Sequence, residues 1–360
     1  MTRPAISFFG SSLVSAYWNG AATYYRGIIR ALSQRGYAVT FYEPDAYDRQ
    51  AHRDIADPPW AKVVVYAATQ EGVDAVLADG CRADIVVKTS GVGVFDEYLE
   101  AAVLAQRRPA ALTVFWDVDA PATLDRVNSN PGDPFRGLIP QYDLILTYGG
   151  GNPVVQGYAA CGARQCIPIY NALDPLTHFP AERSVSFRAR LGLLANRLPD
   201  REARIDEFFF RAASLLPSHE FLLGGNGWGD RRLPTNVRWA GHVYTRDHNA
   251  FNCSPLAVLN VSRESMARYG YSPATRVFEA AGAGACLITD AWAGIEQFLE
   301  PDREVLVAQD GAAVAAHLEG LTADRARAIG DAARARVLNQ HTYDHRATEL
   351  EGVLGMRSAV

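Results

Sequence analysis

The residues best suited to chemistry lie in one stretch, positions 271–290, whose pattern predicts a helix followed by a buried strand. Ser272 suits the N-cap of that helix and Pro273 its first position, where a missing N–H group costs nothing. The backbone N–H groups that follow, at Ala274 and Thr275, would then have no partner within the helix. Unpaired N–H groups at a helix start bind anions, so this stretch is a candidate anion site.

Two charged residues reinforce this reading of the predicted helix. Arg276 and Glu279 stand three positions apart and therefore share one helix face. A guanidinium group suits a phosphate, and an ionised carboxylate can accept hydrogen bonds from two adjacent hydroxyl groups. The pair would fit a diphosphate at the helix start and a sugar diol beside the carboxylate. A core helix that carries an ordinary surface ion pair is the alternative.

Further candidates follow predicted strands in the first half of the chain. Asp117 and Asp119 come directly after the apolar run 112–116, where an acid can serve as a general base or bind a hydroxyl group. Loop packing or helix capping is the alternative role for both. The residues that could face a ligand from the ends of strands are Tyr17, Trp18, Asn19, Gly20 and Trp116.

The elements that must position these residues alternate between strands and helices. A strand at 5–9, a helix at about 21–35 and a strand at 37–42 open the chain, and a second alternation begins after a Pro- and Asn-rich segment. We expect two facing Rossmann-like domains, residues 1–172 and 173–340, with a C-terminal helix in 341–360. The fingerprint G-x-G-x-x-G is absent, which argues against a dinucleotide coenzyme.

Composition narrows the class of protein. The chain has 360 residues, 48% of them hydrophobic, and a net charge of −5, which argues against nucleic acid or an anionic membrane surface as the main partner. Five cysteines without a C-x-x-C pair favour a reducing compartment. We find no charged-then-apolar leader and no 18-residue apolar run, so we expect a cytoplasmic protein without a membrane span, and peripheral association stays open. No His, Asp or Glu residues have the spacing of a metal site, and no metal is expected.

The second half, about residues 165–355, resembles the C-terminal domain of group 1 glycosyltransferases of the GT-B fold, and more narrowly the branch similar to the spore maturation protein CgeB. The resemblance rests on motifs in the family's order. They are the interdomain segment at 167–174, the loop resembling Gly-Arg-Leu at 194–198, the Gly-x-Gly strand end at 222–227, the Phe-x-Gly-like strand at 237–243 and the helix and strand at 276–288.

The resemblance implies transfer of a sugar from a nucleotide-diphosphate donor to a hydroxyl-bearing acceptor, without a metal or other cofactor. Arg276 would stabilise the leaving diphosphate, Glu279 would bind the ribose, and Asp117 or Asp119 would act as base if the enzyme inverts. The remaining residues implied on the donor side are Arg197, Arg201, Gly225, Asn226, Gly227, Arg263, Ser272, Ala274 and Thr275. On the acceptor side, the aromatic residues Tyr17, Trp18 and Trp116 could stack on a sugar ring.

Two departures and two alternatives accompany this reading. Tyr271 stands where the family often has a glutamate, which would change a sugar contact, and the usual lysine has no counterpart unless Arg201 or Arg204 replaces it. The alternatives are a GT-B domain that binds a nucleotide sugar or a protein partner without turnover, and a nucleotide-sugar epimerase. The resemblance also implies that the C-terminal helix crosses back to the N-terminal domain. The donor base, the sugar, the acceptor and the stereochemical outcome stay open.

Overall fold

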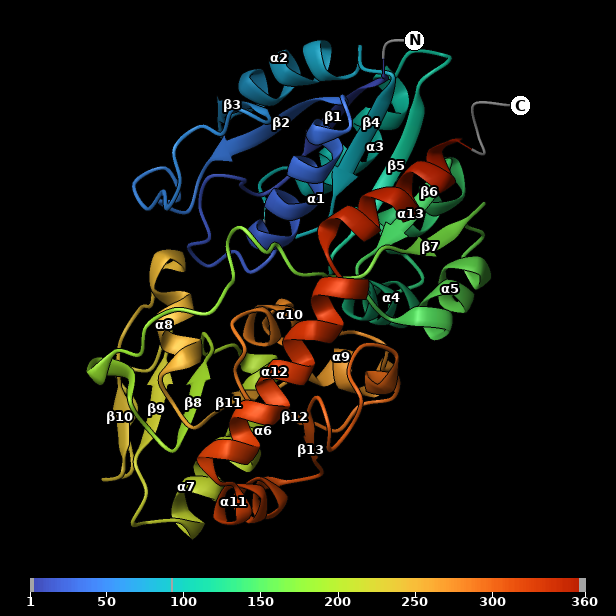
Figure 1. Cartoon of the computed structure of the whole chain (residues 1–360). Coiled ribbons are helices and arrows are strands. Elements are labelled where there is room, and N and C mark those ends of the chain that lie inside the picture. Colours follow the sequence, from blue (N-terminus) through green and yellow to red (C-terminus); the bar gives the residue numbers. More distant parts are fainter. Residues whose placement is uncertain (1–2, 92, 356–360) are drawn as a thin grey trace. The chain divides into compact units, whose positions relative to one another are not determined.

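The computed structural model describes residues 3–91 and 93–355 (Figure 1). The chain divides into two compact units. One comprises Asn171–Thr342, and the other combines the residues before 171 with those after 342. The two units are called the C-terminal and the N-terminal unit below. None of the helices in the described ranges is long and apolar enough to cross a membrane.

The N-terminal unit is built on a seven-stranded sheet in the order β3-β2-β1-β4-β5-β6-β7, and every pairing in it is parallel. The order reverses between β1 and β4, which makes this a doubly wound sheet. The strands are β1 (Ala5–Phe9), β2 (Ala38–Asp45), β3 (Lys62–Ala67), β4 (Ile85–Thr89), β5 (Leu112–Asp117), β6 (Leu144–Thr147) and β7 (Cys166–Pro168).

The helices of this unit alternate with its strands along the chain, as parallel pairing requires. They are α1 (Ala22–Gln34), α2 (Gln70–Gly80), α3 (Asp96–Gln106), α4 (Ala120–Ser129) and α5 (Gly151–Ala160), with short 3-10 turns at Pro134–Gly137 and Ile139–Gln141. The core contains large aromatic side chains, and among them Phe8 packs against both Phe41 and Trp116.

The last helix, α13 (Tyr343–Gly355), also belongs to the N-terminal unit (Figure 1, red). It packs on α1, where Gly27 leaves room for the ring of Tyr343. A Cβ atom at position 27 would lie 2.0 Å from that ring. Arg35, the residue directly after α1, adds ion pairs to Asp344 and Glu351. The predicted return of the C-terminal helix to the N-terminal domain is therefore confirmed.

The C-terminal unit holds a second parallel sheet of six strands, in the order β10-β9-β8-β11-β12-β13. Its order reverses between β8 and β11. The strands are β8 (Leu191–Leu194), β9 (Phe221–Gly224), β10 (Val237–Trp239), β11 (Ala257–Asn260), β12 (Leu287–Asp290) and β13 (Leu306–Ala308). The predicted class, two parallel α/β domains, is confirmed.

Seven helices of the C-terminal unit carry or support the candidate site. They are α6 (Pro199–Ile205), α7 (Arg211–Leu215), α8 (His248–Cys253), α9 (Glu264–Tyr269), α10 (Thr275–Gly282), α11 (Gly311–Gly320) and α12 (Ala323–Gln340). A π-helical turn, Asp206–Phe210, joins α6 to α7. Helix α10 is held closely on two sides: a Cβ atom at Gly282 would lie 2.2 Å from the Leu173 side chain, and one at Gly330 would lie 2.1 Å from the carbonyl oxygen of Gly284.

Candidate functional site

The loops that follow β8, β9, β11 and β12 leave the same edge of the C-terminal sheet, because the strands are parallel. Two of these loops are joined by hydrogen bonds. The Asn226 N–H donates to Oδ1 of Asn196 over 2.9 Å, and the Arg197 N–H donates to the Asn226 carbonyl over 2.9 Å. Gly225 has φ +114°, and a Cβ atom there would lie 2.2 Å from the Ala195 carbonyl oxygen. Only glycine lets the backbone of the second loop come this close.

Helix α10 begins later than predicted. Its N-cap is Ala274, not Ser272, and no side chain of the described residues caps it. The Ser272 hydroxyl donates backwards to the Gly270 carbonyl over 2.9 Å, and the Asn171 amide holds the Pro273 carbonyl over 2.8 Å. These bonds keep the segment before the helix extended. The uncapped start remains where the anion site was predicted, but Ser272 does not form it.

Arg276 and Glu279 lie on one face of α10, as their spacing predicted. The Arg276 Nη1 atom is 3.7 Å from Glu279 Oε2 and donates to Asn252 Oδ1 over 3.1 Å. The two side chains are 14% and 7% exposed. Burial lowers the pKa of Arg276, and Glu279 opposes this. Within the described residues the buried Arg276 Nε has no hydrogen-bond partner, so the guanidinium retains a donor for a ligand.

Two further arginines lie near Arg276, and the three are called the arginine cluster here: Arg201, Arg263 and Arg276. Burial lowers the pKa of Arg201 to about 10, and while Asp200 opposes the shift, the charges of Arg263 and Arg276 add to it. The charges of Arg263 and Arg276 thus repel that of Arg201, and a bound anion would relieve this repulsion. The buried Nε of Arg201 has no hydrogen-bond partner in the described ranges.

Several arginines of this edge are engaged with acids, and Arg263 of the arginine cluster itself pairs with Asp200. Arg197 pairs with Glu202 over 2.7 Å and with Asp230 over 2.9 Å, and the hydrogen bond that it donates to Glu202 raises its pKa. Arg204 pairs with Asp290 over 2.6 Å. Arg197 therefore matches the ion-pair alternative better than a phosphate ligand, and Arg204 is likewise engaged with an acid.

Two histidines beside Glu279 were missed by the sequence reasoning. His178, from the segment before β8, and His248, at the start of α8, each bring a ring nitrogen to within 4.8 Å of the others and of a Glu279 carboxylate oxygen. We call these three residues the histidine–glutamate cluster. The expectation of no metal site rested on spacing along the chain, and this cluster comes from three distant segments. Its side chains are of types that can hold a metal ion.

The histidine–glutamate cluster is desolvated. Burial lowers the pKa of His248 to about 3 and also lowers that of His178, while the charge of Glu279 opposes both shifts. His178 Nε2 lies 3.9 Å from Glu279 Oε1, and the two imidazole rings are 6.0 Å apart. Both imidazoles are therefore neutral near pH 7.

Asp117 does not occupy the position expected of a general base. Its carboxylate is fully buried at the end of β5 and accepts hydrogen bonds from the Ser90 hydroxyl over 2.7 Å, from the Asp119 N–H over 2.9 Å and from the Tyr158 hydroxyl. These bonds fix the loop that follows the strand, which is a structural role. Asp119 is the N-cap residue of α4 and is partly exposed, so it is the better placed of the two acids.

The residues predicted on the acceptor side also divide into buried and exposed side chains. Trp116 is 1% exposed and donates to the Tyr24 hydroxyl over 2.9 Å, so it belongs to the core and offers no stacking surface. Asn19 is buried and donates to the carbonyls of Ser12 and Ser15. Trp18 is 41% exposed with φ +50°.

The other two members of the acceptor-side set lie next to Trp18. Tyr17 stacks on His52 at 4.0 Å, and Gly20 borders open space. Of the predicted aromatic contacts, Trp18 is the one that offers a ring to solvent.

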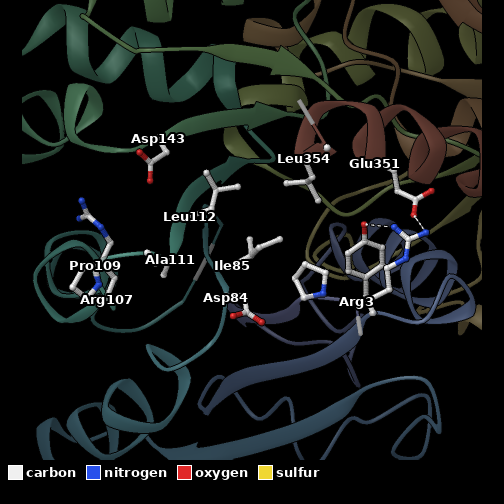
Figure 2. Close-up of a pocket in the computed structure, with 14 residues that line it drawn as sticks. Arg3, Asp84, Ile85, Arg107, Pro109, Ala111, Leu112, Asp143, Glu351 and Leu354 are labelled. Carbon is white, nitrogen blue, oxygen red and sulfur yellow. Dashed lines mark hydrogen bonds and ion pairs between the residues drawn. The ribbon is translucent and has the colours of Figure 1, made fainter. Parts of the chain in front are cut away.

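A cavity of about 660 Å³ lies at a different place in the N-terminal unit (Figure 2). It is bordered by Arg3, Asp84 and Leu112, at the amino ends of β1, β4 and β5, and by Glu351 of α13. Arg3 is already paired with Glu351 over 3.1 Å. The cavity opens at the edge of the sheet opposite to the loops that carry Trp18 and Asp119, so it is not part of the candidate site.

Comparisons with known proteins bear on the fold of the chain. Residues 201–352 match the family described as glycosyl transferase-like, and no curated protein matches the chain. A sucrose-phosphate synthase from Thermosynechococcus elongatus matches with a TM-score of 0.75 at 14% identity, over 99% of this chain and 100% of that chain. Anabaena Alr3699/HepE in complex with UDP and glucose matches with a TM-score of 0.71 at 12% identity, over 98% and 100%.

A third structure extends the comparison. An alpha-glucosyltransferase in complex with UDP-glucose and DNA containing an abasic site matches with a TM-score of 0.71 at 11% identity, over 98% of this chain and 99% of that one. Identities this low show a common fold. The chain has the fold of the GT-B glycosyltransferases, two parallel-sheet α/β domains, and over residues 201–352 it is similar to the glycosyl transferase-like family.

Proposed function

We propose that the protein is a glycosyltransferase, of hexosyltransferase type, that moves a sugar from a nucleotide-diphosphate donor to a hydroxyl group. The observation that carries the proposal is the arginine cluster beside the uncapped start of α10, with two buried guanidinium Nε atoms that have no partner among the described residues. Such an arrangement suits a diphosphate. Because Anabaena Alr3699/HepE is complexed with UDP and glucose, UDP-glucose is the first donor to test.

The arginine cluster would supply the chemistry of the leaving group. When the bond between the anomeric carbon and the phosphate oxygen breaks, the electron pair stays on the diphosphate, and its negative charge grows. Arg276, the α10 N–H groups and Arg201 would stabilise that charge, and preorganised donors of this kind lower the barrier without a metal ion in the chemical step. Glu279 would accept hydrogen bonds from the ribose hydroxyls and so fix the position of the donor.

On the acceptor side we propose Asp119 as the base if the reaction inverts, with Trp18 as an aromatic surface for a sugar ring. The acceptor itself is open. One structural neighbour is complexed with DNA, whereas the net charge of −5 makes nucleic acid an unfavourable partner for this chain. Assignment to the CgeB-like branch and a cytoplasmic location are parts of the proposal, the latter supported by five cysteines that are all free thiols.

Specific observations favour each alternative. Tyr271, which replaces the family's glutamate, has φ +49° and packs against Gly294, so a binding module without turnover is the first rival. His178 and His248 beside Glu279 favour the epimerase, for which acid–base groups near the diphosphate are expected.

A thermal-shift panel of nucleoside diphosphates and their sugars tests the proposal, because a ligand of the native state raises its apparent stability. We expect stabilisation by UDP and UDP-glucose, and slow release of UDP from UDP-glucose without an acceptor. An Arg276→Met variant should lose both. Stabilisation without any release would favour the binding module, and release of a product with an inverted sugar centre would favour the epimerase. If no nucleotide or nucleotide sugar in the panel raises the melting temperature, the proposed donor site is refuted.

A further inference from the structure

The histidine–glutamate cluster has the side chains of a metal site, and the chemistry of sugar transfer does not use two of them. His178 is 3% exposed, and its Nε2 has no hydrogen-bond partner within the described ranges. His248 Nδ1 is likewise buried without a partner there. Two buried imidazole nitrogens without a hydrogen-bond partner among the described residues, both in side chains close to one carboxylate, are unusual in a folded protein and point to a ligand.

The second nitrogen of His248 fixes its orientation. With its proton on Nε2, His248 donates to the Val243 carbonyl over 3.3 Å, which leaves Nδ1 as the acceptor toward the cluster. A ring N–H bound to a backbone carbonyl is the usual outer support of a metal-binding histidine.

We propose that His178, His248 and Glu279 form a binding site for a divalent transition-metal ion such as Zn²⁺. Two imidazoles and one carboxylate suit Zn²⁺, whereas Mg²⁺ and Ca²⁺ prefer oxygen ligands. In a tetrahedral zinc site the ligand atoms lie about 3.3 Å apart, from bond lengths of about 2.0–2.1 Å. The candidate ligand atoms lie within 4.8 Å of one another, so binding of the ion would draw them together by up to about 1.5 Å. The fourth position is left for water.

The charges next to the histidine–glutamate cluster affect its affinity for a metal ion. Glu279 Oε1 faces His178, and Oε2 faces Arg276 at 3.7 Å, so the carboxylate would bridge the ion and the guanidinium. The charge of Asp174 also acts on His178 and favours a cation. Repulsion from Arg276 makes the site weaker than a structural zinc site with four protein ligands.

The metal site and the proposed donor site share Glu279. An ion bound to this carboxylate would compete with the ribose, a consequence that rests on the proposed function. Binding of the ion itself does not depend on that function, so it is measured without nucleotide.

The test is a calorimetric titration of the chelator-treated full chain with Zn²⁺ and, separately, with Mg²⁺. We expect one Zn²⁺ per chain and no comparable Mg²⁺ binding. Since loss of an outer-shell contact already costs about 10–100-fold, His248→Gln and Glu279→Gln should each weaken Zn²⁺ binding by about 100-fold or more. His219→Gln is the matched control, because that histidine lies outside the cluster and contacts Ser218.

Three results would overturn the proposal: no Zn²⁺ binding to the wild type, equal binding of Mg²⁺, or Zn²⁺ binding that survives in both cluster variants. Circular dichroism melts verify that each variant is folded. If His248→Gln fails to fold, His178→Gln replaces it, and visible absorption of the Co²⁺-loaded wild type provides a readout that needs no variant. A Co²⁺ spectrum typical of six oxygen ligands would contradict nitrogen ligation.

Discussion

Replacing Glu279 by glutamine tests the proposed ribose contact most directly, because the change keeps the shape and removes the charge. Glu279 is 7% exposed, so water offers little competition for its hydrogen bonds. A hydrogen bond to a charged group contributes about 1.5–3 kcal/mol, and one between neutral groups about 0.5–1.5 kcal/mol. Since Arg276 at 3.7 Å already shares the charge, we take the middle of each range.

These values translate into a ratio of affinities. In the wild type, UDP should bind about 45-fold more tightly than 2′-deoxy-UDP, and in Glu279→Gln the preference should fall to about 5-fold. We compare the ratio of the two affinities and not the affinities themselves, because the variant leaves the buried Arg276 without its carboxylate and is expected to be less stable. Lower stability would weaken binding of both nucleotides but would not change the ratio.

Isothermal titration calorimetry with both nucleotides measures the ratio. Glu300→Gln is the control, since this exposed acid pairs with Arg303 and lies outside the site. An unchanged preference for UDP in Glu279→Gln would refute the ribose assignment, even if both affinities dropped together. A loss of affinity for 2′-deoxy-UDP alone, with the affinity for UDP unchanged, would also refute the ribose assignment.

Three further predictions concern charges elsewhere in the structure. Arg201→Met should weaken UDP binding by about 10–100-fold, through loss of a charged hydrogen bond, whereas Arg197→Met should change it less than threefold, and calorimetry compares the two. Asp117→Asn should cost about 1–3 kcal/mol of unfolding free energy with little effect on donor hydrolysis, whereas Asp119→Asn should reduce sugar transfer at unchanged stability if the enzyme inverts. Burial raises the pKa of Glu100 from 4.5 to about 7, with Lys88 opposing. Because the pKa is raised in the folded state, the wild type has its full stability below pH 4.5 and loses part of it as the pH rises to 7. Glu100→Gln should therefore be more stable than the wild type at pH 8 but not at pH 4. Chemical denaturation at the two pH values measures the difference.

The sequence alone determined the class of fold and the elements that carry the site. Apolar runs of strand length alternate with helical patterns, and this alternation is enough to predict parallel sheets, because parallel strands need crossover helices. The place of Arg276 and Glu279 on one helix face also followed from spacing, since the helix period fixes which residues share a face. The Gly-x-Gly motif also predicted a glycine at position 225, where the structure has φ +114°.

Tertiary structure decided how side chains beside the strands are directed and which distant segments meet. Asp117 and Asp119 look alike in sequence, but one turns inward to Ser90 and Tyr158 and the other begins a helix. Ser272 has the side chain of an N-cap, yet it bonds backwards to Gly270. Such outcomes depend on which partners lie within hydrogen-bond reach, and local propensity does not contain that information.

The same limit applies to the two clusters. Arg201, Arg263 and Arg276 come from three elements of the C-terminal unit, and His178 and His248 reach Glu279 from two others. Periodicity describes neighbours along the chain, whereas the order of the strands in the sheet decides which loops lie side by side. Sequence therefore identified the helix that carries Glu279, and only the packing of the parallel sheet decided which charges and lone pairs surround that carboxylate.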